Sequence, residues 1–149
     1  MSKKLEATYI LVIKISEDFK TIVGKLGEIS FREGYYIYVG SARGCLETRL
    51  RRHLRKDKKI YWHIDYLLQN GKVQILQIWV IQNSIECWTA DVFNKNSLSE
   101  VVKKGFGSSD CNCLTHLFYI KNKEKAESIL KEIGFSKIID LDFKILINR

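Results

Sequence analysis

Tyr38, Arg49 and His53 are the side chains of this sequence that are best placed for chemistry. They supply a phenol, a guanidinium and an imidazole within the stretch YVGSARGCLETRLRRH. A guanidinium can hold phosphate oxygens through two parallel hydrogen bonds. A tyrosine beside basic groups loses its proton more readily than free phenol does, so it can act as a base toward water. These residue types therefore favour a site that binds a phosphate and activates a water molecule beside it.

A strand must position Tyr38. Residues 35–39, YYIYV, are β-branched or aromatic, which predicts a strand that ends at Gly40. Alternation along this strand puts Tyr36 and Tyr38 on the same face. Gly40 has no side chain, so we expect it to leave backbone space for a ligand. The site is therefore expected in a polar cleft at the end of this strand.

A helix that begins near Cys45 must position Arg49 and His53. Its apolar stripe has helical spacing and consists of Leu46, Leu50 and Leu54. Arg49 and His53 lie one turn apart on the border of this stripe, close to the predicted sheet. Three arginines face away from the stripe: Arg51, Arg52 and Arg55. The border position is unusual for a charge that only solubilises the chain, which favours a functional role for Arg49.

The basic character of the chain is concentrated in this same segment. The formal net charge is +8, and residues 49–59 hold seven Lys or Arg against Asp57 alone. A charge run of this density favours a polyanionic partner, and we expect nucleic acid, chiefly DNA, bound through its phosphates. The expected contacts are Ser41, Arg43, Arg51, Arg52, Arg55, Lys58 and Lys59. The alternative interpretation of the run is a solvated surface.

The remaining periodicity predicts an α+β fold with a small central, mainly antiparallel sheet flanked by helices, in a single domain spanning residues 1–149. Strands are expected over residues 7–15, 21–31, 35–39, 72–82 and 116–121, the first of them central and covered on both faces. Helices are expected from near residues 45, 62 and 84, and over residues 98–104 and 123–133. Residues 138–147 are predicted as one more strand or a packed tail. No run of about 18 apolar residues and no signal peptide is visible, so we expect a soluble cytoplasmic protein that does not contact membranes.

The strand and helix around Tyr38 resemble the second half of the core motif of the GIY-YIG nuclease superfamily. The matching residues are Tyr38-Val39-Gly40 and Arg49, and the superfamily's first motif matches at Tyr9. The wider strings YYIYVGSARG, RLRRHLR and YWHIDYLL resemble more closely one branch of unassigned function. That branch is found in archaea and bacteria, alone or beside an endonuclease-III-type glycosylase. The closer resemblance runs from about Tyr9 to Tyr119, and it implies a GIY-YIG-like fold.

The resemblance also implies catalytic roles. Tyr9 or Tyr38 is expected as the general base and Arg49 as the residue that holds the phosphate. From its place beside Arg49 on the helix border, and not from the resemblance, His53 is expected as a further catalytic residue.

The resemblance further implies a metal ligand on the helix after the last core strand. We expect this helix to begin near Ser84 and to bury Ile85, Trp88 and Val92. Glu86 is its only glutamate, whereas the spacing in the superfamily points nearer to Asp91. We expect Glu86 to hold Mg²⁺ or another divalent cation, with Asp91 as the alternative.

Residues 105–117, GFGSSDCNCLTHL, form the most unusual loop of the chain. It offers three polar side chains that are expected to line the site: Ser109, Asp110 and His116. Cys111, Cys113 and His116 are also residue types that bind zinc. CxC is tighter than the usual CxxC spacing, and a complete set of ligands needs Cys87 from a distant helix. We therefore expect packed thiols and no tightly bound zinc.

The expected function is Mg²⁺-dependent phosphodiester hydrolysis by an endonuclease in DNA repair or processing, with a repair protein as a further partner. Ser41 stands where many GIY-YIG enzymes have a lysine that lowers a tyrosine pKa. The main alternative is therefore a non-catalytic DNA- or RNA-binding module on the same fold. A third interpretation is a domain that binds small molecules or proteins and has an incidental basic face. It predicts no salt-dependent binding of DNA.

Overall fold

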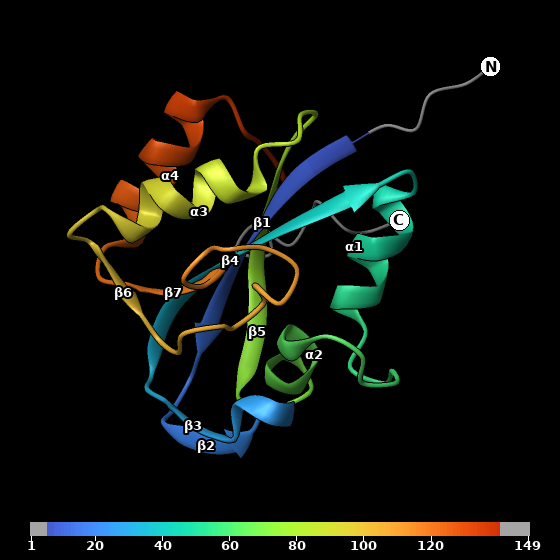
Figure 1. The fold of residues 1–149 in the computed structure, drawn as a ribbon, viewed down its shortest axis with the longest axis vertical. Helices are drawn as coiled ribbons and strands as arrows, with labels where there is room; N and C mark the ends of the chain where they lie inside the picture. Colours follow the sequence, from blue (N-terminus) through green and yellow to red (C-terminus); the bar gives the residue numbers. More distant parts are fainter. Residues whose placement is uncertain (1–5, 141–149) are drawn as a thin grey trace.

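The structure, a computed structural model, describes residues 6–140. An antiparallel sheet of six strands forms its centre (Figure 1). The strand order is β6-β7-β4-β1-β5-β8. These strands are β1 (Glu6–Ile15), β4 (Gly34–Arg43), β5 (Val73–Ile81), β6 (Ser99–Val101), β7 (Leu117–Ile120) and β8 (Ser136–Asp140). A separate two-stranded sheet consists of β2 (Phe19–Ile22) and β3 (Glu28–Phe31), joined through the 3-10 turn η1 (Gly24–Leu26). The expected α+β class with a central antiparallel sheet is confirmed.

Four α-helices within residues 6–140 cover the two faces of the six-stranded sheet: α1 (Leu46–Leu54), α2 (His63–Leu68), α3 (Glu86–Asn94) and α4 (Lys123–Ile133). One face packs against α1, α2, the β2-β3 hairpin and the segment between β6 and β7. The other face packs against α3 and α4 (Figure 1). We call residues 102–116, which connect β6 to β7, the β6-β7 loop. None of the four helices is long and apolar enough to span a bilayer.

β1 is the central strand, and its side chains alternate between the two faces. Its register with β4 pairs Tyr9 with Gly40 and Leu11 with Tyr38, so Tyr9, Leu11 and Tyr38 share the face covered by α1 and α2. Ile10 points to the opposite face, where it packs with residues of α3 and α4. All of these side chains are buried. The prediction of a central strand covered on both faces is therefore confirmed.

β4 continues further than the sequence predicts. The sequence predicts a break at Gly40, but Ser41 pairs with Thr8 and the strand reaches Arg43. The chain leaves the strand at Gly44, whose φ of +92° lies in the left-handed region that favours glycine. The longer strand carries the backbone of Ser41 to the start of α1, where the candidate site lies.

Two predicted elements differ in type from those of the structure. The sequence predicts one strand over residues 21–31, but the chain reverses at η1 and forms the β2-β3 hairpin. It predicts a helix over residues 98–104, but residues 99–101 form β6 and pair with β7. The β-branched residues Val101 and Val102 suit a strand better than a helix. Because β6 flanks it, β7 is not the edge strand that the sequence predicts. Of the segment 138–147, only residues 138–140 fall within the described residues, and they belong to β8.

The helix α3 is rotated relative to the prediction. Trp88, expected in the core, is 56% exposed, while Thr89, Ala90 and Phe93 are buried. The small side chain of Ala90 allows this face of the helix to approach the sheet closely. The helix starts at Glu86, after Ile85 as its N-cap residue, so Glu86 occupies its first position.

Candidate functional site

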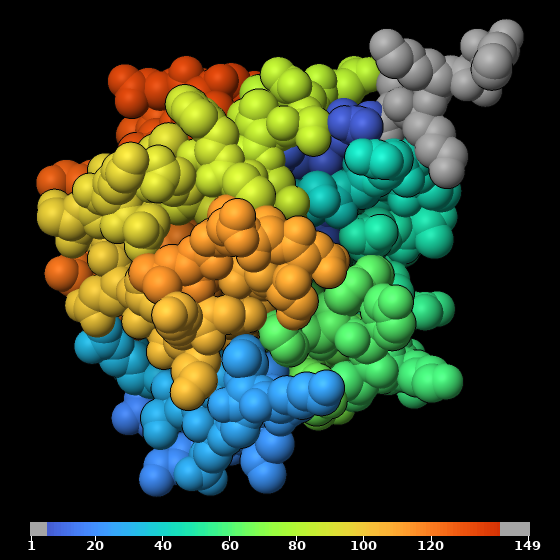
Figure 2. All heavy atoms as spheres, in the orientation of Figure 1, coloured from blue at the N-terminus to red at the C-terminus, as the bar shows by residue number. Residues whose placement is uncertain are grey.

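A pocket of about 230 Å³ lies at the end of β4. Its lining comes from the central strands, α1, the start of α2, the start of α3 and the β6-β7 loop: Tyr9, Tyr38, Ser41, Arg49, Trp62, Glu86, Gly107, Asp110, Cys111 and His116. Figure 2 shows the β6-β7 loop in orange on the surface, between the yellow-green start of α3 and the green segment that contains α2. Segments far apart in the sequence therefore meet around one polar pocket.

Tyr9 and Gly40 are packed against each other. A Cβ atom at position 40 would lie only 2.4 Å from the Tyr9 ring, closer than such atoms approach in real structures. The prediction that Gly40 leaves space for a ligand is therefore wrong, because the Tyr9 ring fills that space. The absent side chain has a different consequence: it allows Tyr9 to lie across β4 and reach the pocket.

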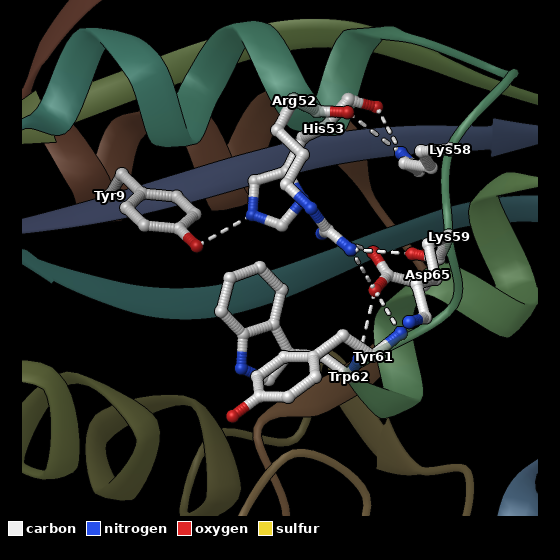
Figure 3. A network of polar contacts seen from close by, with 8 residues as sticks. All are labelled: Tyr9, Arg52, His53, Lys58, Lys59, Tyr61, Trp62 and Asp65. Carbon is white, nitrogen blue, oxygen red and sulfur yellow. Dashed lines mark hydrogen bonds and ion pairs between the residues drawn. The ribbon is translucent and has the colours of Figure 1, made fainter.

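Tyr9 and His53 form a buried hydrogen-bonded pair. The Tyr9 hydroxyl lies 2.7 Å from His53 Nε2 (Figure 3), and both residues are 2% exposed. Burial raises the pKa of Tyr9 to about 12, against the opposing charge of Arg49. Burial likewise lowers the pKa of His53 to about 3, so its ring is neutral at pH 7. Basic surroundings were expected to favour loss of the tyrosine proton, and that prediction is wrong for the free protein because desolvation outweighs the positive charge.

Tyr38 is the second tyrosine of the pocket. Its ring packs edge-on against His53 and Phe106, with ring centroids 6.4 and 6.5 Å apart. Burial raises the pKa of Tyr38 well above its ordinary value, and the neighbouring Tyr9 and Glu86 act in the same direction. Gly107 of the β6-β7 loop lies directly on this ring, since a Cβ atom there would be 3.0 Å from it. Tyr38 is therefore held between α1 and the loop.

Arg49 enters the pocket from α1, as its position on the helix border predicts. Its Nη1 atom donates a hydrogen bond to the carbonyl oxygen of Ser41 at 2.9 Å. Its guanidinium carbon lies 4.5 Å from the centre of the Trp62 ring, a distance at which a cation is attracted to an aromatic face. These contacts hold the guanidinium at the pocket while several of its N–H donors stay available for a ligand.

Glu86, rather than Asp91, is the carboxylate of the α3 helix at the pocket. Its Oε2 atom lies 3.3 Å from His116 Nδ1. Burial lowers the pKa of His116, but the contact with Glu86 and its negative charge outweigh burial and raise that pKa. Asp91 is exposed, forms an ion pair with Lys95 at 2.9 Å and is not among the pocket residues. Of the two carboxylates that the sequence leaves open, Glu86 is the one whose side chain lies at the pocket.

The β6-β7 loop supplies two of its three predicted site residues. Asp110 and His116 line the pocket, whereas Ser109 is exposed and does not. The loop also contributes Gly107, whose backbone N–H donates to His63 Nδ1 at 2.9 Å. Through this hydrogen bond His63 connects the start of α2 to the loop, which is a structural role. Trp62 is a pocket residue that the sequence does not single out, because a tryptophan before a short helix carries no catalytic signal.

Arg52 points inward, contrary to the prediction that it faces away from the packed side of α1. Its guanidinium donates to both carboxylate oxygens of Asp65 at 2.9 Å and to the carbonyl of Lys59 at 2.7 Å (Figure 3). Asp65 is fully buried and also accepts hydrogen bonds from the backbone N–H groups of Tyr61 and Trp62. This network fixes the segment between α1 and α2, and thereby the position of Trp62.

The other residues expected to contact DNA differ in their surroundings. Lys58 Nζ donates to the carbonyl oxygens of Arg52 and His53, both at 2.9 Å, and so closes the end of α1. The remaining basic residues of the set are exposed: Arg43, Arg51, Arg55 and Lys59. Two of these form exposed ion pairs, Arg43 with Glu6 and Arg51 with Glu47. Exposed pairs of this kind contribute little to stability and exchange readily for a phosphate.

Three thiols and an imidazole gather beside the pocket. The ligand atoms of Cys87, Cys111, Cys113 and His116 all lie within 4.8 Å of one another. Their separation in the sequence is therefore no obstacle to a shared metal, because α3 carries Cys87 to the β6-β7 loop. A larger hollow, of about 630 Å³, lies elsewhere, between the β2-β3 hairpin and β6. None of the predicted catalytic residues lines it.

Comparison with protein families gives a match over most of the chain. Residues 8–138 match the family described as domain of unknown function DUF123. This range runs from β1 into β8 and includes every residue that lines the pocket. No curated protein and no solved structure matches the chain.

Proposed function

Because the chain belongs to the DUF123 family, whose function is unknown, we propose a function from the site itself: a divalent-cation-dependent endonuclease on a GIY-YIG-like fold that hydrolyses DNA phosphodiesters. The observation that carries the proposal is the convergence of Tyr9, Tyr38, Arg49 and Glu86 on one pocket, with His53 bonded to Tyr9. Hydrolysis needs a base for water, a positive group for the phosphate and charge stabilisation at the leaving oxygen. The pocket contains residue types suited to each requirement.

Tyr9 and His53 act together as the base. Tyr9 takes a proton from the attacking water while its own hydroxyl proton passes to His53 Nε2, 2.7 Å away. In the free protein burial opposes both steps, because it keeps phenol and imidazole neutral. A phosphate in the pocket adds negative charge, which favours the protonated form of His53. The pair thus becomes a competent base when the substrate is bound.

Arg49 holds the phosphate. Its contacts with Ser41 and Trp62 fix its direction before the substrate arrives. A guanidinium that is already oriented stabilises the charge of the transition state more than one that must first be ordered. The N–H groups not used by Ser41 can donate to two phosphate oxygens.

The carboxylates of Glu86 and Asp110 fit a magnesium site, since both line the pocket and Mg²⁺ is commonly held by one or two carboxylates together with phosphate oxygens. A bound cation of this kind supplies stabilisation of the charge that develops on the leaving oxygen. Glu86 is the stronger candidate of the two, because its side chain is partly buried at the pocket, whereas Asp110 is exposed.

The exposed basic residues supply the contacts to the DNA backbone. Arg51, Arg55 and Lys59 lie on or just after α1, the helix that carries Arg49 into the pocket. Phosphate contacts from this helix would bind DNA with little dependence on sequence and with strong dependence on salt. A role in DNA repair or processing, with a repair protein as partner, belongs to the same proposal and rests on the resemblance alone.

The proposal is tested by incubating flapped, branched and nicked DNA with the full chain in Mg²⁺. We expect cleavage by the wild-type protein and a loss of about 100-fold or more in Arg49→Ala and in Glu86→Gln. Arg32→Ala is the matched control, because Arg32 is an exposed arginine that lies outside the pocket and outside the basic segment of α1. Cleavage that is equal in all four proteins would indicate a contaminating nuclease. Salt-dependent binding without any cleavage would favour the non-catalytic module.

A further inference from the structure

The cluster of Cys87, Cys111, Cys113 and His116 is more than a packing arrangement. Thiols that serve as small apolar side chains are usually among the most buried residues of a protein. Here Cys87 is exposed, Cys111 and Cys113 are half-buried, and only His116 is buried. Cys113 packs against the core beside α3 and α4, as expected of a packed thiol, but the exposed Cys87 does not fit that role. Four metal-ligating atoms converge from two elements at a partly open surface position.

The distances fit a tetrahedral zinc ion. Zinc bound at ~2.3 Å to sulfur and ~2.0 Å to nitrogen places its ligand atoms roughly 3.5 to 3.8 Å apart. Cys111 Sγ lies 3.5 Å from His116 Nε2, and all four ligand atoms lie within 4.8 Å of one another. Small side-chain adjustments of about 1 Å are enough to close such a site. The set of three thiolates and one imidazole is a known structural combination for zinc.

The other side of the His116 ring supports the same conclusion. With Nε2 directed at the cysteines, Nδ1 faces Glu86 Oε2 at 3.3 Å. A histidine that binds a metal through one nitrogen usually donates its other N–H to a carboxylate, which fixes both the tautomer and the ring orientation. His116 is 1% exposed, so its ring is held by its surroundings.

We propose that Cys87, Cys111, Cys113 and His116 bind one structural zinc ion that fastens the β6-β7 loop to the start of α3. Four protein ligands leave no open position for a substrate, so the zinc has a structural role and is separate from the catalytic cation. The loop supplies Asp110 to the pocket, and Glu86, the residue before Cys87, also lines the pocket and lies 3.3 Å from His116. The zinc would thereby hold in place two elements that line the candidate active site. This inference does not depend on nuclease activity.

The decisive experiment is elemental analysis of the full, untagged chain, purified under reducing conditions from zinc-supplemented medium and desalted. We expect about one zinc per chain in the wild-type protein and a marked loss in Cys87→Ser and Cys113→Ser. Cys45→Ser is the matched control, because Cys45 is exposed and does not belong to the cluster. It should retain the wild-type zinc content. Zinc below ~0.2 per chain in the wild-type protein, or equal zinc in all variants, would overturn the proposal.

A cobalt titration gives a second readout that does not depend on the folding of variants. Wild-type protein stripped with a chelator and kept reduced should bind one Co²⁺, with thiolate charge-transfer bands that zinc abolishes on addition. Removal of the metal should also lower the thermal midpoint, and zinc should restore it. A cobalt spectrum without thiolate bands would contradict the site. A disulfide between two of Cys87, Cys111 and Cys113 in the protein as isolated under reducing conditions would contradict it equally.

Discussion

Replacing Arg52 by alanine should destabilise the protein strongly, although Arg52 belongs to the basic segment of α1. The replacement removes the two hydrogen bonds of 2.9 Å that the guanidinium donates to Asp65. Asp65 is fully buried, and its carboxylate would retain only the backbone donors of Tyr61 and Trp62. Removing one partner of a buried ion pair typically costs about 3 to 5 kcal/mol, because the remaining charge is left uncompensated.

The lower end of this range applies here. The Arg52 side chain is 21% exposed, so water can reach part of the space that it leaves. We therefore expect a loss of about 3 kcal/mol, which corresponds to roughly 9 °C in the thermal midpoint of a chain of this size. Arg51→Ala is the matched control. It removes an exposed i,i+4 pair with Glu47, and such a pair contributes about 0.3 to 0.5 kcal/mol.

Urea unfolding of Arg52→Ala, Arg51→Ala, Asp65→Asn and the Arg52→Ala/Asp65→Asn double variant measures this directly. Asparagine removes the uncompensated charge, so the double variant should be more stable than the sum of the single losses predicts. Burial raises the pKa of Asp65, but its hydrogen bonds, foremost those from Arg52, outweigh burial and lower it. The stabilisation by the pair is therefore present above the ordinary pKa of 3.8 and is lost as the pH falls through the lowered value. An Arg52→Ala variant within about 0.5 kcal/mol of Arg51→Ala would show that the buried pair does not stabilise the fold in this way.

Three further predictions concern the site and its surroundings. Gly40→Ala should cost about 1 to 3 kcal/mol in unfolding experiments, because the added Cβ atom would lie 2.4 Å from the Tyr9 ring; an unchanged stability would contradict that packing. His53 has a pKa of about 3 in the folded protein against 6.5 ordinarily. The stabilisation of the fold by neutral His53 is therefore complete above pH 6.5, and the free energy of unfolding falls by about 2 to 3 kcal/mol on this account by about pH 4.5. The His53→Gln variant should lack this part of the acid sensitivity, and equal pH profiles for variant and wild type would count against the pKa. Reversing Arg51 and Arg55 to glutamate should reduce the salt dependence of DNA binding by about one logarithmic slope unit for each phosphate that α1 no longer neutralises, whereas an unchanged slope would remove α1 from the interface.

The local pattern was sufficient to predict the position of Arg49 and His53. Their spacing of four residues on one helix, at the border of the leucine stripe, places them on the side of α1 that faces the sheet. The face of the sheet on which Tyr38 lies could be predicted in the same way, from the alternation of side chains along its strand. These predictions hold because each depends on one regular element and on its period. The central position of β1 could be predicted for the same reason, because a long apolar run is typical of a strand that is buried on both faces.

Features that depend on contacts between distant segments could not be predicted in this way. Arg52 has the sequence surroundings of an exposed arginine, and only the return of α2 toward α1 brings the buried Asp65 to it. The approach of Cys87 to Cys111 depends on the path of the β6-β7 loop, which has no regular period to interpret. The role of Gly40 was likewise hidden, because it is determined by a tyrosine on the neighbouring strand.

The cleavage rate of Tyr9→Phe is the sharpest test of the proposed nuclease function. This variant keeps the ring against β4 and removes only the hydroxyl bonded to His53. Tyr36→Phe is the matched control, because it removes a buried hydroxyl that donates to the Arg32 carbonyl and does not line the pocket. In single-turnover experiments with Mg²⁺ and flapped DNA, we predict that Tyr9→Phe loses about 100-fold or more in rate at unchanged DNA affinity, while Tyr36→Phe cleaves as the wild-type protein does. Cleavage by Tyr9→Phe at the wild-type rate would contradict the role of Tyr9 and His53 as the base.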